Sequence, residues 1–195
     1  MQFKQAGEYI TNKMRKDLPE HLVYHSVEHV QDVFNAAENI GKLENITTHE
    51  MDLLLTAAWY HDAGFILQAN GHEEESCRIA QEVLPAYDYT DEEIGQICGL
   101  IMATRIPQTP QNHLEQIMAD ADLDYLGRDD YFITSYKLYQ ELTHTGVICN
   151  EQDWQQVQIN FMEKHHYFTQ TAINLRQQKK QENLQQIKST TILPQ

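Results

Sequence analysis

Hydrophobic positions recur every three or four residues along most of this chain, and strict alternation of hydrophobic and polar positions is almost absent. That spacing is typical of helices that bury one face, so the pattern predicts an all-α protein. Thr47 with Glu50 and Thr90 with Glu93 match the capping box that opens many helices, and Ser26 is a further candidate cap. The predicted helices cover residues 3–14, 26–40, 47–61, 73–84, 90–101, 114–125, 130–142, 150–165 and 169–187.

Two histidines and two aspartates fall on the apolar faces or at the ends of these helices. His29 alone is as readily explained as a hydrogen-bonded core residue, but it recurs with the pair His61-Asp62 and with Asp122. Because burying unpaired polar groups is expensive, all four require partners, and one divalent metal ion would satisfy them together. Two imidazoles and two carboxylates suit Mn, Fe, Zn, Ni, Co or Mg, and the sequence does not choose among them.

Length and composition predict one domain with a continuous core. The chain has 195 residues, of which 41% are hydrophobic, and no run is apolar enough to cross a bilayer. The N-terminus shows no basic segment followed by an apolar run, so we expect no secretory signal. The widely spaced Cys77, Cys98 and Cys149 suit reduced thiols. A soluble, cytoplasmic protein without a membrane partner is expected.

The charge balance limits the classes of partner. A formal net charge of -15 argues against long nucleic acids, which are bound through clustered Lys and Arg. An anionic substrate would have to be held locally, by a metal ion and one or two basic residues. We therefore expect a small substrate, while a homodimer remains open.

The order of these residues resembles the HD-domain superfamily of metal-dependent phosphohydrolases. The matching segments are YHSVEH at 24–29, AAWYHDAG at 57–64 and ADL at 121–123. The resemblance implies a single-domain HD-type helical bundle over residues 1–195. Its metal-binding core would span about 22–128, followed by C-terminal helices over 130–190.

The first segment is also similar to a motif of cyclic-nucleotide phosphodiesterases, remote relatives of that superfamily. In that motif the first histidine donates a proton and the second binds metal. By position, His25 is implied as the general acid and His29 as the ligand. Ser26 stands where the motif has asparagine, so the phosphodiesterase substrate does not transfer with the motif.

Three further positions bear on the site. His72 occupies a place where some superfamily members bind a second metal, although a histidine at a helix start has an equally simple structural explanation. The histidine that fully binuclear members carry before the last aspartate is not evident in residues 102–105. Arg105 is the candidate phosphate contact, whereas Arg128 beside two aspartates is expected to form a structural ion pair. Asp120 and Asp124 are candidate partners for a ligand histidine.

The function predicted from these residues is hydrolysis of a phosphate ester of a nucleotide or another small metabolite. Metal-activated water would attack phosphorus, Asp62 would help to orient it, and His25 would protonate the leaving group. Two alternatives stay open: an HD-fold di-iron oxygenase, which needs a complete second site including His72, and a non-catalytic module that senses a nucleotide.

Overall fold

The protein is all-α in the part of the chain that the structure describes. The computed structural model describes residues 1–190, where every regular element is a helix and no strand occurs, so the predicted fold class is confirmed. The α-helices are α1 (Phe3–Asp17), α2 (Val27–Leu43), α3 (Thr48–Tyr60), α4 (His72–Val83), α5 (Asp91–Met102), α6 (His113–Asp122), α7 (Tyr131–His144), α8 (Glu151–Lys164) and α9 (Gln170–Ser189). Short 3₁₀ helices are η1 (Ala63–Ile66), η2 (Leu84–Tyr87) and η3 (Asp124–Gly127).

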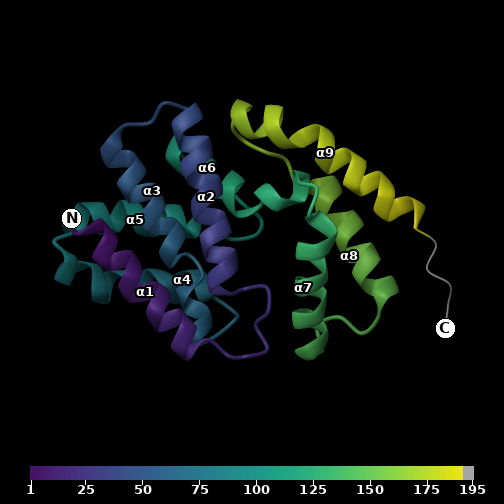
Figure 1. The fold of residues 1–195 in the computed structure, drawn as a ribbon, viewed down its shortest axis with the longest axis horizontal. Helices are drawn as coiled ribbons and strands as arrows, with labels where there is room; N and C mark the ends of the chain where they lie inside the picture. Colours follow the sequence, from purple (N-terminus) through teal and green to yellow (C-terminus); the bar gives the residue numbers. More distant parts are fainter. Residues whose placement is uncertain (191–195) are drawn as a thin grey trace. The chain divides into compact units, whose positions relative to one another are not determined.

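The chain divides into two compact units. The first comprises Met1–Glu20 and His25–Leu123, and the second comprises His21–Tyr24 and the residues from Asp124 onward. In the first unit α3 is central and packs against α2, α5 and α1 (Figure 1). In the second, α9 packs against η3 and α8.

The predicted caps account for where helices of the first unit begin. Ser26 accepts a hydrogen bond from the backbone N–H of His29, and both predicted capping boxes are present. The end of α3 differs from the prediction, because the helix stops at Tyr60 and His61 is its C-cap. Asp62 then leaves helical geometry and η1 follows, so His61 and Asp62 lie in a turn.

A cluster of aromatic rings joins three helices of the first unit. Trp59 of α3 lies with its ring centroid 4.5 Å from that of Phe3 and 4.8 Å from that of Phe34. Gly7 of α1 lies against the same indole ring, so closely that a Cβ there would overlap it. A glycine inside a helix is normally unfavourable, and here it lets α1 approach α3.

Polar contacts organise the second unit. The Asn183 side chain is buried and donates hydrogen bonds to the carbonyls of Leu126 and Arg128, both at 3.0 Å. The Arg176 guanidinium donates to Asp124 at 2.6 Å. These contacts attach α9 to the segment that includes η3.

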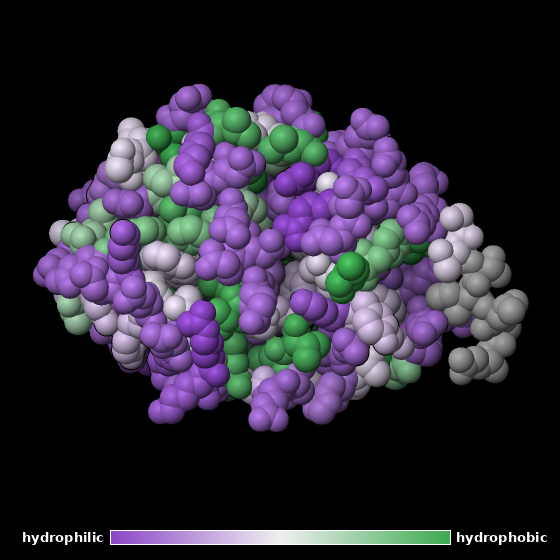
Figure 2. All heavy atoms as spheres, viewed as in Figure 1, coloured by the Kyte–Doolittle hydropathy of each residue, from purple (hydrophilic) through white to green (hydrophobic). Residues whose placement is uncertain are grey.

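The face of the molecule drawn in Figure 2 is predominantly polar. Hydrophilic residues cover most of the face in Figure 2, and hydrophobic residues show in separate groups. Exposed large hydrophobic residues are scattered from Met1 to Leu175. Within residues 1–190, no helix combines the length and apolarity that a bilayer crossing requires.

Substitution of Gly7, with Gly95 as a control, tests the packing of α1 on α3. Gly7→Ala should lower the free energy of unfolding by about 1–3 kcal/mol, because the new methyl overlaps Trp59. Gly95→Ala is the matched control, since Gly95 is also inside a helix but has nothing within 4 Å of its Cβ position. That change should stabilise by about 0.5–1 kcal/mol. Urea denaturation measures both, and equal effects of the two substitutions would contradict this packing.

Candidate metal centre

Three helices of the first unit bring the four predicted ligands together. His29 lies in the first turn of α2, Asp122 is the last residue of α6, and His61 and Asp62 form the turn after α3. The His61 and Asp62 side chains are only 1% and 4% exposed, and that of Asp122 is 14% exposed. These are positions at helix ends, where the backbone can turn side chains of different elements toward one point.

The two histidine nitrogens lie at nearly equal distances from each other and from one oxygen of each aspartate. Nε2 of His29 is 3.4 Å from Nε2 of His61, from Oδ2 of Asp62 and from Oδ1 of Asp122. Nε2 of His61 is 3.2 Å from the same Asp62 oxygen and 3.4 Å from the same Asp122 oxygen. One donor atom can be chosen from each of His29, His61 and Asp122 so that the three atoms lie within 4.8 Å of one another.

These separations fit a shared cation. Nitrogen and oxygen ligands lie about 2.1 Å from a transition metal, so two ligands of one ion are separated by about 3.0 Å at a right angle and about 4.2 Å when opposite. All five distances fall inside that range. Oδ2 of Asp62 is buried and has no hydrogen-bond partner within residues 1–190. An unsatisfied carboxylate oxygen facing two imidazoles suits a metal ligand.

Contacts to α4 and to the backbone fix the His61 turn. Nδ1 of His61 lies 2.8 Å from the carbonyl oxygen of Ala58. Because a carbonyl only accepts, Nδ1 carries a proton, and in the neutral ring Nε2 presents its lone pair to the cluster. Ser76 donates to the His61 carbonyl at 2.6 Å and accepts from the Gly64 N–H at 2.8 Å. A Cβ on Gly64 would overlap the His72 carbonyl oxygen, so only glycine permits this close approach.

The electrostatics of the cluster favour a cation. Burial tends to raise the pKa of Asp62, but His61 outweighs it and holds that pKa below its usual range. Burial likewise opposes ionisation of Asp122, whose pKa is nevertheless lowered to about 2, mainly by hydrogen bonding with His29 and His61. The pKa of His61 is raised despite burial, because both carboxylates stabilise its protonated form. Both aspartates therefore carry negative charge near neutral pH.

His72 lies on the other side of the Asp62 carboxylate. Its Nε2 is 3.5 Å from Oδ1 of Asp62, while Oδ2 faces His29 and His61. Nδ1 of His72 lies 3.0 Å from the carbonyl oxygen of Ala69 and therefore carries the proton of the neutral ring, which leaves the lone pair on Nε2. One carboxylate thus faces imidazoles through both oxygens.

His25 is near the cluster and stacks on an aromatic ring. Its ring centroid is 6.2 Å from that of His29 and 4.0 Å from that of Phe65, with an interplanar angle of 22°. Phe65 also stacks on His72 at 4.1 Å. One phenyl ring therefore contacts both His25 and His72.

The other predicted site residues have different surroundings. Arg105 is about half exposed and pairs with Glu74 of α4, without contacting the four-residue cluster in the part of the chain described. Arg128 forms the predicted structural ion pair, with two hydrogen bonds of 2.9 Å to Asp130. The prediction for Asp124 is wrong: its carboxylate pairs with Arg176 and Arg128 in the second unit.

Two residues near the cluster were not predicted from the sequence. Ser76 is fully buried inside α4, and a buried helical hydroxyl normally has a hydrogen-bonding role, which was an available signal. Phe65 follows the HD pair closely, but nothing in the hydrophobic pattern indicates that its ring stacks on two histidines.

Comparison with known proteins adds information about the fold alone. No protein-family model matches this chain, and no curated protein matches it. A crystal structure of a Lactobacillus plantarum protein, solved as a structural genomics target, is similar with a TM-score of 0.68. The two sequences are 19% identical, and the match covers 97% of this chain and 98% of the other.

Metal binding is tested by removing single ligands. Wild-type protein loaded with Mn²⁺, Co²⁺ or Zn²⁺ should unfold at a higher temperature than chelator-treated protein. At a metal concentration of 100 Kd, binding should raise the free energy of unfolding by about 2.7 kcal/mol. His61→Ala and Asp62→Ala should lose both the bound metal and this stabilisation. His49→Ala is the control, because its side chain is 56% exposed and lies outside the cluster. Undiminished metal content in both ligand variants would rule out the centre.

Proposed function

We propose that this protein is an HD-type metal-dependent phosphohydrolase that acts on a phosphate ester of a nucleotide or another small metabolite. The observation that carries the proposal is the convergence of two imidazole nitrogens and two carboxylate oxygens, including the unsatisfied Oδ2 of Asp62. Their order along the chain also resembles the HD motif. The similar solved structure supports the fold and does not bear on the chemistry.

The residues of the cluster have distinct roles in this proposal. His29, His61, Asp62 and Asp122 would hold one divalent ion, which when bound makes a coordinated water more acidic and offsets charge on the phosphoryl oxygens. Asp62 also helps to orient the attacking water through its carboxylate. His61 is kept in the required tautomer by the Ala58 carbonyl.

His25 is the proposed general acid. Its position beside His29 and its stacking on Phe65 support a role next to the metal ligands. From there the imidazolium would donate a proton to the departing oxygen of the ester. Stacking restricts the ring to a narrow range of orientations, which favours proton transfer along a fixed direction.

The substrate is proposed to be small. The net charge of -15 opposes long polyanions, so the phosphate would be held chiefly by the metal and by one basic residue. Arg105 stays the proposed basic residue, and it would have to exchange its exposed partner Glu74 for the substrate. The free thiols of Cys77, Cys98 and Cys149 support a reducing compartment, and we propose the cytoplasm.

One observation favours a second candidate function, a di-iron oxygenase. The Asp62 carboxylate faces His72 through one oxygen and the His29–His61 pair through the other, as a ligand bridging two ions would. Iron content and oxygen consumption discriminate between the two. An oxygenase would hold two irons per chain and consume oxygen with substrate, whereas the phosphohydrolase would release phosphate or a phosphomonoester without oxygen.

Substitution of His25 tests the hydrolytic mechanism. His25→Ala should retain the metal but reduce kcat by about 10²- to 10⁴-fold on a phosphate ester with an alkoxide leaving group. The loss should be much smaller for a nitrophenyl ester, whose leaving group needs no proton. The control is His113→Ala, a side chain that is 53% exposed and pairs with Glu44. Loss of metal from the His25 variant would instead make this residue a ligand, and equal losses on both esters would contradict its role as an acid.

A further inference from the structure

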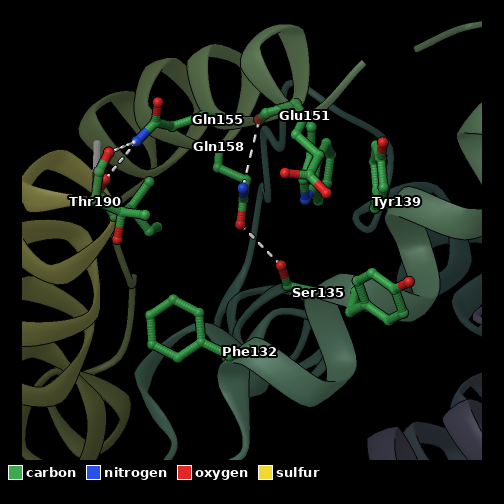
Figure 3. Close-up of a pocket in the computed structure, with 10 residues that line it drawn as sticks. Phe132, Ser135, Tyr139, Glu151, Gln155, Gln158 and Thr190 are labelled. Carbon is green, nitrogen blue, oxygen red and sulfur yellow. Dashed lines mark hydrogen bonds between the residues drawn. The ribbon is translucent and has the colours of Figure 1, made fainter. Parts of the chain in front are cut away.

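The second unit contains a groove between α7 and α8. It has a volume of about 240 Å³, and Ile187 of α9 and Thr190 also line it. Figure 3 shows Phe132 and Tyr139 of α7 on its wall, with Gln158 of α8 reaching across to Ser135. This volume is below the roughly 300–1,000 Å³ of pockets that hold drug-sized ligands, so the groove would take only a smaller organic molecule.

Aromatic rings form much of the groove. The ring centroid of Tyr139 is 6.0 Å from that of Tyr136 and 6.0 Å from that of Trp154, which joins the two helices in one aromatic surface. Tyr136 is 55% exposed and Phe132 is 37% exposed, so these rings are accessible to a ligand. The faces of electron-rich rings attract cations, and tryptophan and tyrosine do so most strongly.

The charged groups of the groove point to the same class of ligand. Among the ten lining residues, Glu151 carries the single carboxylate, and none is Lys, Arg or His. The Glu151 carboxylate forms no hydrogen bond or ion pair within residues 1–190. The chain as a whole carries a formal charge of -15, which adds a field that attracts cations and repels anions.

Side-chain amides hold the walls of the groove in place. Gln158 accepts hydrogen bonds from the hydroxyls of Tyr131 and Ser135, both at 2.8 Å, and so connects α8 to α7. Gln155 donates to the carbonyls of Ile187 and Thr190 at 2.6 and 2.8 Å, which connects α8 to the end of α9. A groove fixed in this way needs little reorganisation to bind a ligand.

We propose that this groove binds a small organic cation of the quaternary ammonium class, with the cationic group over the rings of Tyr136, Tyr139 and Trp154 and near the carboxylate of Glu151. The apolar methyl groups of such a cation suit the aromatic walls, and its diffuse charge is weakly hydrated. This site is separate from the metal-ligand cluster, whose residues all belong to the first unit.

The test compares choline with its neutral isostere 3,3-dimethylbutan-1-ol on the full chain. Binding is followed through the fluorescence of Trp154 in a Trp59→Phe background, which removes the only other tryptophan, and by calorimetry on unmodified protein. Choline should bind saturably, and the neutral isostere about tenfold more weakly. Tyr136→Leu should weaken choline binding by about tenfold, and Glu151→Gln should weaken it several-fold, with a reduced dependence on salt.

Tyr9→Leu is the matched control, because Tyr9 is 41% exposed but lies on α1 of the first unit. Its choline affinity should equal that of wild type. Equal binding of choline and the isostere would overturn the proposal, as would the absence of binding by both. Self-association that Tyr136→Leu abolishes would likewise overturn it, because the groove would then be an interface between two copies of the chain.

Discussion

The first unit depends on the electrostatic attraction between two carboxylates and two imidazoles that are largely buried. Asp62 is almost completely buried, and an isolated ionised carboxylate in that position would be strongly unfavourable. Its negative charge persists because His61 and His29 lie within 3.4 Å. Since α2, the end of α3 and the end of α6 each supply part of this cluster, its electrostatic balance also constrains how those three helices pack.

The same constraint explains the uncharged contacts around the cluster. Ser76 fixes the backbone at His61 and Gly64, while Gly64 allows the start of α4 to approach the turn. His72 enters at that first residue of α4 and faces the second oxygen of Asp62. The geometry of the cluster is therefore set by hydrogen bonds and close packing as well as by charge, as is usual for preorganised sites.

Local sequence signals predicted much of the fold and part of the candidate site. Capping at Ser26, Thr47 and Thr90 depends on neighbouring residues, so the helix starts could be predicted and were confirmed. The convergence of His29, His61, Asp62 and Asp122 was also expected, from their places on apolar faces or at helix ends and from their order along the chain.

Contacts distant in sequence could not be predicted in this way. The pairing of Asp124 with Arg176 spans 52 positions, and no local pattern distinguishes it from the expected contact with a histidine. The stacking of Phe65 on His25 and His72 is set by how η1 and α4 meet. The groove between α7 and α8 arises similarly, because it depends on how residues of two different helices meet.

Anomalous diffraction from crystals of the protein soaked in Mn²⁺ tests the central claim most directly. The account predicts a single strong peak at about 2.0–2.2 Å from Nε2 of His29, Nε2 of His61, Oδ2 of Asp62 and Oδ1 of Asp122. A second, weaker peak near His72 would be compatible with it. An ordered structure at saturating Mn²⁺ with no anomalous density between these four atoms, and with His61 hydrogen-bonded directly to the aspartates, would contradict it.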